Sequence, residues 1–402
     1  MTQTVFLLGG QGAYLPGMFA GDATLDEPLV VIDSVAAEFG HPGVRPLLTD
    51  PAAPAAAVLA QSDPLALQLA VFAAAVGDYR KAAVVAVPDV LVGHSLGELA
   101  ALTAAGGFDL ADAARLVCLR TNALLENVTV PGGLIAVELS ERRARHVVGT
   151  VDDRRLAVGV INAPTWTVLS GPTTALDVAR TVAEGLGARV VTLPAPFAFH
   201  SPGLALAASS FALAAANTEQ RPLRTPVYSP LLGEYVTDSM DFVSLLVGHL
   251  TSPVDFLAAV RALHVDGMRR VVECGRGGLS ALVRATVPGV ETEGGRSASP
   301  ATPEPVTERA AAVPADIGTV VERLRELYAS TLGYPVEAVD AEADLEADLG
   351  IDSLKRAEML GKVGAEFGLS DSVNSGRFLA HSSLSELAKM IGDTLAGSGA
   401  GR

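Results

Sequence analysis

The chain is poor in cysteine, in basic residues and in long apolar runs. Two cysteines among 402 residues, Cys118 and Cys274, are too few for a disulfide framework and indicate buried apolar side chains in a reducing, cytoplasmic environment. The 29 basic residues are outnumbered by 45 acidic ones, so the net charge of −16 would repel nucleic acids and anionic membrane surfaces. The longest apolar helix candidate, residues 65–76, contains Gln68 and is too short to cross a bilayer. The N-terminus lacks the basic and long apolar regions of a signal peptide.

Composition changes abruptly near residue 290. Residues 291–316 are rich in Pro, Ser, Thr, Gly and Glu and show no apolar period, which predicts a flexible linker. We therefore expect a body over residues 1–287, a linker over 288–315, a C-terminal domain over 316–396 and a disordered tail over 397–402.

Strand and helix patterns alternate through most of the body, which predicts an α/β fold with a parallel sheet. The outer parts, residues 1–128 and 196–287, contain strand candidates at 4–8, 90–92, 226–228 and 270–273 and a helix candidate at 63–79. Between them, residues 129–195 follow the order strand, helix, strand, strand, helix, strand. This order predicts a ferredoxin-like subdomain inserted into the parent sheet.

Residues 93–97, Gly-His-Ser-Leu-Gly, join one of these strands to a helix that begins near Glu98. A serine on a sharp strand-to-helix turn has its oxygen exposed, and glycines two residues to either side allow close backbone approach. The Leu96 N–H group lies at the helix N-terminus, where it can stabilise a developing oxyanion. Ser95 is therefore a candidate nucleophile.

A serine nucleophile needs a base, and seven histidines are available. His94 is adjacent to the candidate nucleophile and should point away from its hydroxyl, and His146 falls in an arginine-rich, exposed helix. The other three set aside are His41 in a proline-rich loop, His264 on a polar helix end and His381 in the C-terminal domain. His249 and His200 remain, and His200 follows the apolar run 190–196 and is flanked by aromatic residues. On position alone, His200 fits a hydrogen-bonded core histidine as well as a general base.

A series of short motifs runs in order through the body. They are Gly-Gln-Gly at 10–12, Gly-His-Ser-Leu-Gly-Glu at 93–98, Gly-Gly at 132–133, Asn-Ala-Pro at 162–164, Ser-Gly at 170–171, Ala-Phe-His-Ser-Pro at 198–202, Tyr-Ser-Pro at 228–230 and His-Leu-Thr-Ser-Pro-Val at 249–254. With these motifs the body resembles the malonyl-CoA:acyl carrier protein transacylases and the acyltransferase domains of polyketide and fatty acid synthases. The resemblance implies an α/β-hydrolase-like parallel-sheet subdomain that carries the ferredoxin-like insert.

The same resemblance implies roles for individual residues. His200 falls on the catalytic histidine of the family, and the backbone N–H groups of Gln11 and Leu96 would form the oxyanion hole. Asn162 and His249 are assigned to the substrate site. His249 falls where the catalytic histidine of the family finds its orienting backbone carbonyl, so its ring would be idle.

Arg120 and Phe199 indicate the substrate class. Arg120 alone would be an ordinary solvated helix residue, but the family places an arginine at this spacing to hold the malonyl carboxylate, which a guanidinium can bind bidentately. In the relatives, a phenylalanine at the position of Phe199 goes with malonyl and a serine with methylmalonyl. The resemblance therefore implies malonyl-CoA as substrate, with a preference of about 1–3 kcal/mol against an added methyl group.

The C-terminal domain begins with an amphipathic pattern over residues 317–328 and contains further helix patterns, which predict a small four-helix bundle. Ser353 stands at the start of one helix, where serine also serves as an ordinary N-cap. However, residues 348–354, Asp-Leu-Gly-Ile-Asp-Ser-Leu, are similar to the attachment motif of acyl carrier proteins. The resemblance implies 4′-phosphopantetheine on Ser353, added by a phosphopantetheinyl transferase.

Together these expectations describe a malonyltransferase that works through a Ser95 ester. It would deliver the acyl group to the carrier on Ser353 or to a separate carrier, beside a ketosynthase or other polyketide synthase subunits, with no metal. One alternative is an acyl hydrolase that clears stalled carriers, which Arg120 and Phe199 oppose because such an enzyme should accept neutral chains. Another is a non-catalytic docking body, which the joint presence of Ser95, His200 and Arg120 opposes.

Overall fold

The computed structural model describes residues 3–294, 317–332, 340–343, 345, 359, 363 and 383–398. The chain divides into two compact units, Met1–Thr302 and Pro303–Arg402. No helix within the described ranges combines the length and the apolarity that a membrane span requires.

A six-stranded sheet forms the centre of the first unit, with the strand order β11-β10-β1-β2-β7-β8. Its strands are β1 (Gln3–Leu8), β2 (Val90–Gly93), β7 (Val227–Ser229), β8 (Glu234–Tyr235), β10 (Met268–Cys274) and β11 (Glu291–Gly294). All neighbours are parallel except β7 and β8, which form an antiparallel pair. The α/β fold with a parallel sheet is thus confirmed.

Side chains alternate along the central strands and divide the core into two layers. Phe6 and Leu8 of β1 belong to one buried cluster, whereas Val5 and Leu7 of the same strand belong to the other. Both faces of the sheet are therefore covered, as a parallel sheet requires.

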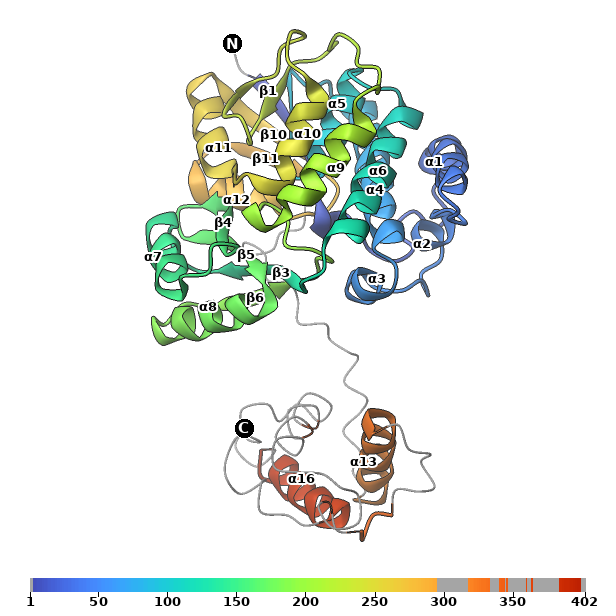
Figure 1. Cartoon of the computed structure of the whole chain (residues 1–402), viewed down its shortest axis with the longest axis vertical. Helices are drawn as coiled ribbons and strands as arrows, with labels where there is room; N and C mark the ends of the chain where they lie inside the picture. Colours follow the sequence, from blue (N-terminus) through green and yellow to red (C-terminus); the bar gives the residue numbers. More distant parts are fainter. Residues whose placement is uncertain are drawn as a thin grey trace. The chain divides into compact units, whose positions relative to one another are not determined.

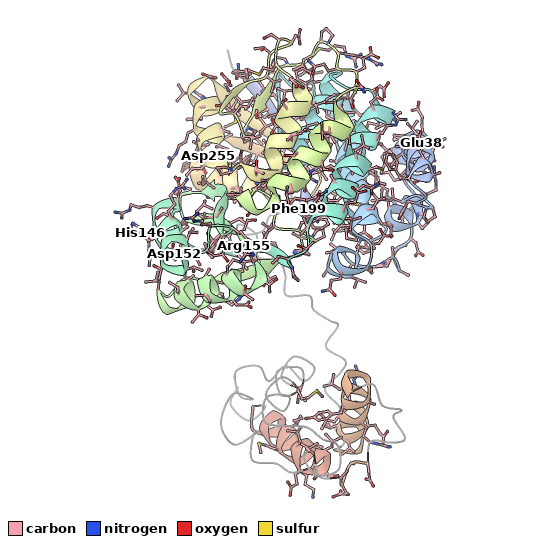
Figure 2. All side chains as sticks on the ribbon, in the orientation of Figure 1. Glu38, His146, Asp152, Arg155, Phe199 and Asp255 are labelled. Atoms are coloured by element: carbon pink, nitrogen blue, oxygen red, sulfur yellow. The ribbon has the colours of Figure 1, made fainter. Side chains whose placement is uncertain are left out.

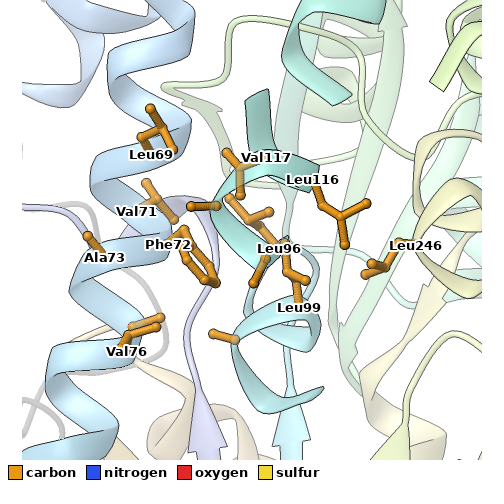
Figure 3. Close-up of a cluster of buried hydrophobic side chains, with 14 of the residues drawn as sticks. Leu69, Val71, Phe72, Ala73, Val76, Leu96, Leu99, Leu116, Val117 and Leu246 are labelled. Atoms are coloured by element: carbon orange, nitrogen blue, oxygen red, sulfur yellow. The ribbon is translucent and has the colours of Figure 1, made fainter. Parts of the chain in front are cut away.

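Helices cover both faces of this sheet (Figure 1). The first cluster is covered by α1 (Asp26–Glu38), α2 (Arg45–Thr49), α3 (Ala56–Ser62), α4 (Pro64–Val85), α5 (Gly97–Ala105), α6 (Leu110–Asn127), α9 (Ala205–Ala215) and α10 (Phe242–Thr251), and the second by α11 (Phe256–Val265) and α12 (Leu279–Thr286). Figure 3 shows apolar side chains of α4, α5, α6 and α10 meeting around Phe72 and Leu99. Helix α4 extends beyond the predicted residue 79, because residues 80–85, which are mostly exposed and contain no Gly or Pro, continue the helix.

A second sheet carries the inserted subdomain, with the order β6-β3-β5-β4-β9. Its elements are β3 (Gly132–Val137), α7 (Glu141–Val151), β4 (Ala157–Ala163), β5 (Trp166–Pro172), α8 (Thr173–Gly185) and β6 (Val190–Leu193), which confirm the ferredoxin-like order. The fifth strand, β9 (Val254–Asp255), comes from the large subdomain and pairs in parallel with β4. The insert is therefore joined to its host by main-chain hydrogen bonds.

Two predicted boundaries differ from the structure. The linker was expected from residue 288, but residues 291–294 form the edge strand β11, because parallel pairing with β10 gives this polar segment hydrogen-bond partners. The tail was expected from residue 397, but the last helix, α16 (Leu384–Ser398), includes residues 397 and 398.

The second unit contains two described helices, α13 (Ile317–Leu332) and α16. Their apolar faces form one buried cluster, which includes Val320, Leu324, Tyr328, Leu387 and Ile391. This packing agrees with the predicted helical domain. Ser353 lies outside the described residues.

Candidate active site

Ser95 lies on the turn between β2 and α5, at the carboxyl edge of the central sheet. Its φ of 54° falls in the left-handed region, which a non-glycine residue adopts only under constraint. A Cβ atom on Gly93 would collide with the backbone of Glu98, and one on Gly97 with the Leu8 carbonyl. The two glycines therefore allow the tight turn that the motif predicted.

His200 is brought to this serine from a loop that follows β6. Its Nε2 atom lies 2.8 Å from Ser95 Oγ, and its Nδ1 atom lies 3.2 Å from the carbonyl oxygen of Ser252. His200 also has a left-handed φ of 62°, held by hydrogen bonds on both sides: Ser170 Oγ to the Phe199 carbonyl (2.5 Å) and Ser201 N to the Leu250 carbonyl (3.1 Å). The predicted pair of nucleophile and base is therefore within hydrogen-bond reach.

The protonation of His200 suits a base. The side chain is buried, with 2% of its surface exposed. Burial lowers the pKa of the His200 ring well below the ordinary value for histidine, and nearby His249 and Arg120 lower it further. The ring is therefore neutral at neutral pH and can accept the Ser95 proton.

The proposed oxyanion-hole residues stand at two helix N-termini. Gln11 is the first residue of the short 3-10 helix η1 (Gln11–Ala13), and Leu96 immediately precedes α5. The first N–H groups of a helix have no partner within it and can bind an anion. A Cβ atom on Gly10 would lie 3.4 Å from both Leu96 N and Ser95 Cβ, so η1 is packed directly against the elbow.

A cavity of about 170 Å³ opens onto Ser95 and His200 between the two subdomains. Apolar residues of the inserted sheet, including Trp166 and Val168, form much of its lining. Asn162 also lines it, and its Oδ1 atom lies 2.8 Å from His94 Nε2. Nε2 of His94 is thus engaged by Asn162, whereas the Ser95 hydroxyl is paired with His200.

Arg120 lies at the bottom of this cavity on α6. It is 4% exposed, and its guanidinium carbon lies 4.5 Å from the centre of the Phe199 ring. Burial lowers the pKa of Arg120 to about 10, which leaves the group charged at neutral pH. Within residues 3–294, no acidic side chain lies at ion-pair distance from it. The structure thus holds a buried cation, next to the nucleophile, that lacks an anion.

Gln68 is a site residue that the sequence argument missed. It is fully buried on α4, accepts a hydrogen bond from Arg120 Nη1 (2.8 Å) and donates one to Gln11 Oε1 (2.7 Å). Gln11 in turn donates to the Pro194 carbonyl (3.3 Å). A chain of hydrogen bonds therefore links Arg120 to the oxyanion-hole residue, and the signal for it was a lone glutamine in an apolar helix.

The expectation for His249 needs correction. The carbonyl that orients His200 belongs to Ser252, the residue that caps the C-terminus of α10, and not to His249. The His249 ring is not idle, because its Nε2 atom lies 2.7 Å from Glu98 Oε2 in a buried pair. Among the described residues that line the 170 Å³ cavity, His249 does not appear.

Figure 2 labels Phe199, a residue of the cavity lining, together with surface residues such as His146. Phe199 lies in the interior, where the two subdomains meet, whereas His146 and Asp152 lie on the outer side of α7 (Figure 2). His146 is exposed, as predicted.

A serine on a strand-to-helix turn, within hydrogen-bond distance of a buried histidine, is an arrangement typical of enzymes that transfer acyl groups. Residues 61–297 match the family model described as acyl transferase domain, and the chain belongs to that family. Residues 322–391 match the model described as phosphopantetheine attachment site, which agrees with the predicted carrier domain and its 4′-phosphopantetheine.

Curated relatives include polyketide synthases. The chain is 34% identical over 284 residues to the spectinabilin polyketide synthase system protein NorB of Streptomyces orinoci, covering 68% of this chain and 13% of the relative. It is 34% identical over 188 residues to the pikromycin polyketide synthase component PikAIII of Streptomyces venezuelae, covering 46% and 12%. The chain thus spans only a small part of the length of the curated relatives it matches.

Similar solved structures include both synthase domains and free-standing enzymes. The acyltransferase domain from the second module of the salinomycin polyketide synthase matches with a TM-score of 0.62 and 30% identity, over 73% of this chain and 68% of that one. The acyl-carrier-protein S-malonyltransferase of Burkholderia pseudomallei matches with a TM-score of 0.64 and 28% identity, over 72% and 95%. These likenesses confirm the fold predicted for the body.

Proposed function

We propose that the first unit transfers a malonyl group from malonyl-CoA, through an ester on Ser95, to a phosphopantetheine thiol. The observation that carries this proposal is the buried, charged Arg120, which lines the cavity of Ser95 and lacks an acidic partner within residues 3–294. The terminal carboxylate of malonate supplies that missing anion. A neutral acyl group would leave the cation desolvated and unpaired, and should be rejected.

The first half of the reaction forms the ester. His200 Nε2 accepts the Ser95 hydroxyl proton while Oγ attacks the thioester carbonyl, and the N–H groups of Gln11 and Leu96 stabilise the oxyanion. The carbon–sulfur bond then breaks, and His200 returns the proton to the departing CoA sulfur. The Ser252 carbonyl keeps the Nδ1–H tautomer, so that Nε2 faces the serine throughout.

The second half reverses these steps with another thiol. His200 accepts the proton of the incoming thiol, its sulfur attacks the ester carbon, and Ser95 Oγ leaves and recovers the proton. A 4′-phosphopantetheine arm supplies such a thiol on a long, flexible chain. We propose Ser353 as its attachment point, with a phosphopantetheinyl transferase adding the arm and a ketosynthase or other polyketide synthase subunit using the product. A separate carrier could accept the malonyl group in the same way.

Intact-mass analysis of the phosphopantetheinylated full-length chain tests this proposal. After mixing with malonyl-, methylmalonyl- or acetyl-CoA, we expect malonyl adducts on Ser95 and on the arm, with little acetyl adduct. Ser95→Ala should abolish loading of the arm, and Ser353→Ala should leave the Ser95 ester intact. Arm loading that is unaffected by Ser95→Ala would contradict the proposal, and rapid release of free malonate would favour the hydrolase instead.

A further inference from the structure

Behind Ser95, helices α5 and α10 are joined by a buried pair, Glu98 and His249. His249 Nε2 lies 2.7 Å from Glu98 Oε2, and the two residues are 3% and 0% exposed. Among the described residues this is the one side-chain hydrogen bond that joins these two helices. The chemistry proposed above gives neither residue a part.

The pair is attached closely to the nucleophile on one side. Glu98 follows Ser95 on the same elbow, and its backbone N–H group donates to the Ser95 carbonyl over 2.9 Å. The side chain of Glu98 therefore starts one helical turn from the reactive hydroxyl, and any displacement of α5 would move both groups together.

On the other side the pair is attached to the base. His249 lies one turn before Ser252, whose carbonyl accepts from His200 Nδ1. The carbonyl of Leu250, the next residue after His249, accepts from Ser201 N, and the rings of His200 and His249 meet edge to face with 5.7 Å between their centres. The end of α10 thus carries the contacts that orient the His200 ring.

We propose that Glu98 and His249 form a brace that holds α10 against α5 and so keeps His200 Nε2 within reach of Ser95 Oγ. The inference rests on the proposed acyl transfer, because the brace matters only if Ser95 and His200 react. Both are positioning residues, since the hydrogen bond joins them to each other and not to the reacting atoms.

Stability alone does not account for the pair. Burying two polar groups is costly, and an apolar pair of similar size in the same place is often as stable or more so. Glu98 Oε1 and His249 Nδ1 have no hydrogen-bond partner within the described residues, which adds to the cost. The packing here also leaves a gap of about 10 Å³, whose lining includes His249, Ser95, Arg120, Phe211 and four leucines. A directional bond sets the spacing of the helices where the packing leaves this gap.

The test compares variants that keep or remove the bond without leaving a buried charge unpaired. E98M/H249L replaces the pair by apolar side chains, whereas His249→Gln keeps an amide N–H group near the position of Nε2. The rate of malonyl-Ser95 formation is measured by quenched flow and intact mass over a range of malonyl-CoA concentrations, and the melting temperature is recorded for each variant.

In E98M/H249L we expect the saturating rate to fall about 10- to 100-fold, as for a small misplacement of reacting groups, with KM within about twofold of the wild type. The single variant His249→Gln should keep most of the wild-type rate, at a melting temperature similar to that of the double variant.

A double variant that acylates Ser95 at the wild-type rate, or that loses only affinity for malonyl-CoA, overturns the brace. If it melts below the assay temperature, the rates of E98Q/H249L and His249→Gln at low temperature decide by the same criterion. If the wild type itself forms no malonyl ester, the proposed function fails, and the brace with it.

Discussion

Two hydrogen-bonded networks meet at Ser95, and they differ in how their charge is balanced. The recognition network, Arg120, Gln68 and Gln11, ends in a buried cation without an acid in the described part of the chain. The base network consists of His200 with the Ser252 carbonyl, and of the Glu98–His249 pair, which contains its own acid. The base network contains an acid of its own, whereas the recognition network needs an anion from the substrate. Changes in the two networks should therefore have different kinetic signatures.

The largest effect is expected from the base network. His200→Gln removes the group that accepts the serine proton, so formation of the malonyl-Ser95 ester should slow by at least about 10³-fold. His146→Gln on the exposed side of α7 is the matched control and should have no effect. Quenched-flow mass analysis gives both rates, and a His200→Gln protein with normal rates would rule out this histidine as base.

The second-largest effect is expected at Arg120, where a substitution should alter the selectivity between acyl groups and not the acylation step itself. Arg120→Ala should lower kcat/KM for malonyl-CoA by about 10²-fold or more, because a charge-assisted contact to the carboxylate is lost. The acetyl-CoA rate should stay the same or rise. Arg115→Ala on the same helix, which removes an exposed ion pair with Glu38, serves as control. Equal losses for both substrates would remove the assigned role.

Gln68 links the two halves of the recognition network, so its effect should be intermediate. Gln68→Met should lower kcat/KM for malonyl-CoA about 10-fold, because Arg120 and Gln11 each lose a hydrogen bond. Gln61→Met, at an exposed position on α3, should leave the kinetics unchanged. Steady-state assays with both variants would show whether the chain of bonds matters.

Phe199, next to Arg120 in the recognition network, should affect the choice between malonyl-CoA and methylmalonyl-CoA. Its ring covers Arg120, and a smaller side chain should make room for an α-methyl group. Phe199→Ser should raise the methylmalonyl-to-malonyl ratio about 10-fold, as one methyl group in a pocket allows. Competition between the two CoA esters, followed by mass, measures the ratio directly, and an unchanged ratio would show that another wall sets the choice.

The smallest effect concerns pH. Because the pKa of His200 is lowered, the base stays unprotonated, and active, as the pH falls below the ordinary value. A histidine of ordinary pKa would retain about a tenth of its activity at pH 5.5, whereas we expect kcat/KM to retain a clearly larger fraction. A pH profile whose acid limb lies near pH 6.5 would contradict the buried, neutral base.

The difference between the networks also decides what the sequence could predict. Ser95 was accessible because a strand, two glycines and a helix are local signals, and His200 followed from a motif. Gln68 and Arg120 are 52 residues apart, and Glu98 and His249 are 151 apart, so their pairing depends on how helices pack. The Ser252 carbonyl could not be read from side-chain patterns, since every residue has one. A polar residue inside an apolar helix was the usable clue to Gln68, and Glu98 at the start of the apolar α5 was of the same kind.

Strand β9 gives the inserted subdomain a mechanical role. Val254 pairs with Val160, a residue of the cavity wall, and lies directly beyond Ser252 and Pro253. A hinge motion that widened the cleft by moving β4 would pull on this strand and, through it, on the carbonyl that aligns the imidazole. A single stretch of main chain, residues 252–255, thus connects the wall of the cavity to the carbonyl that accepts from His200 Nδ1.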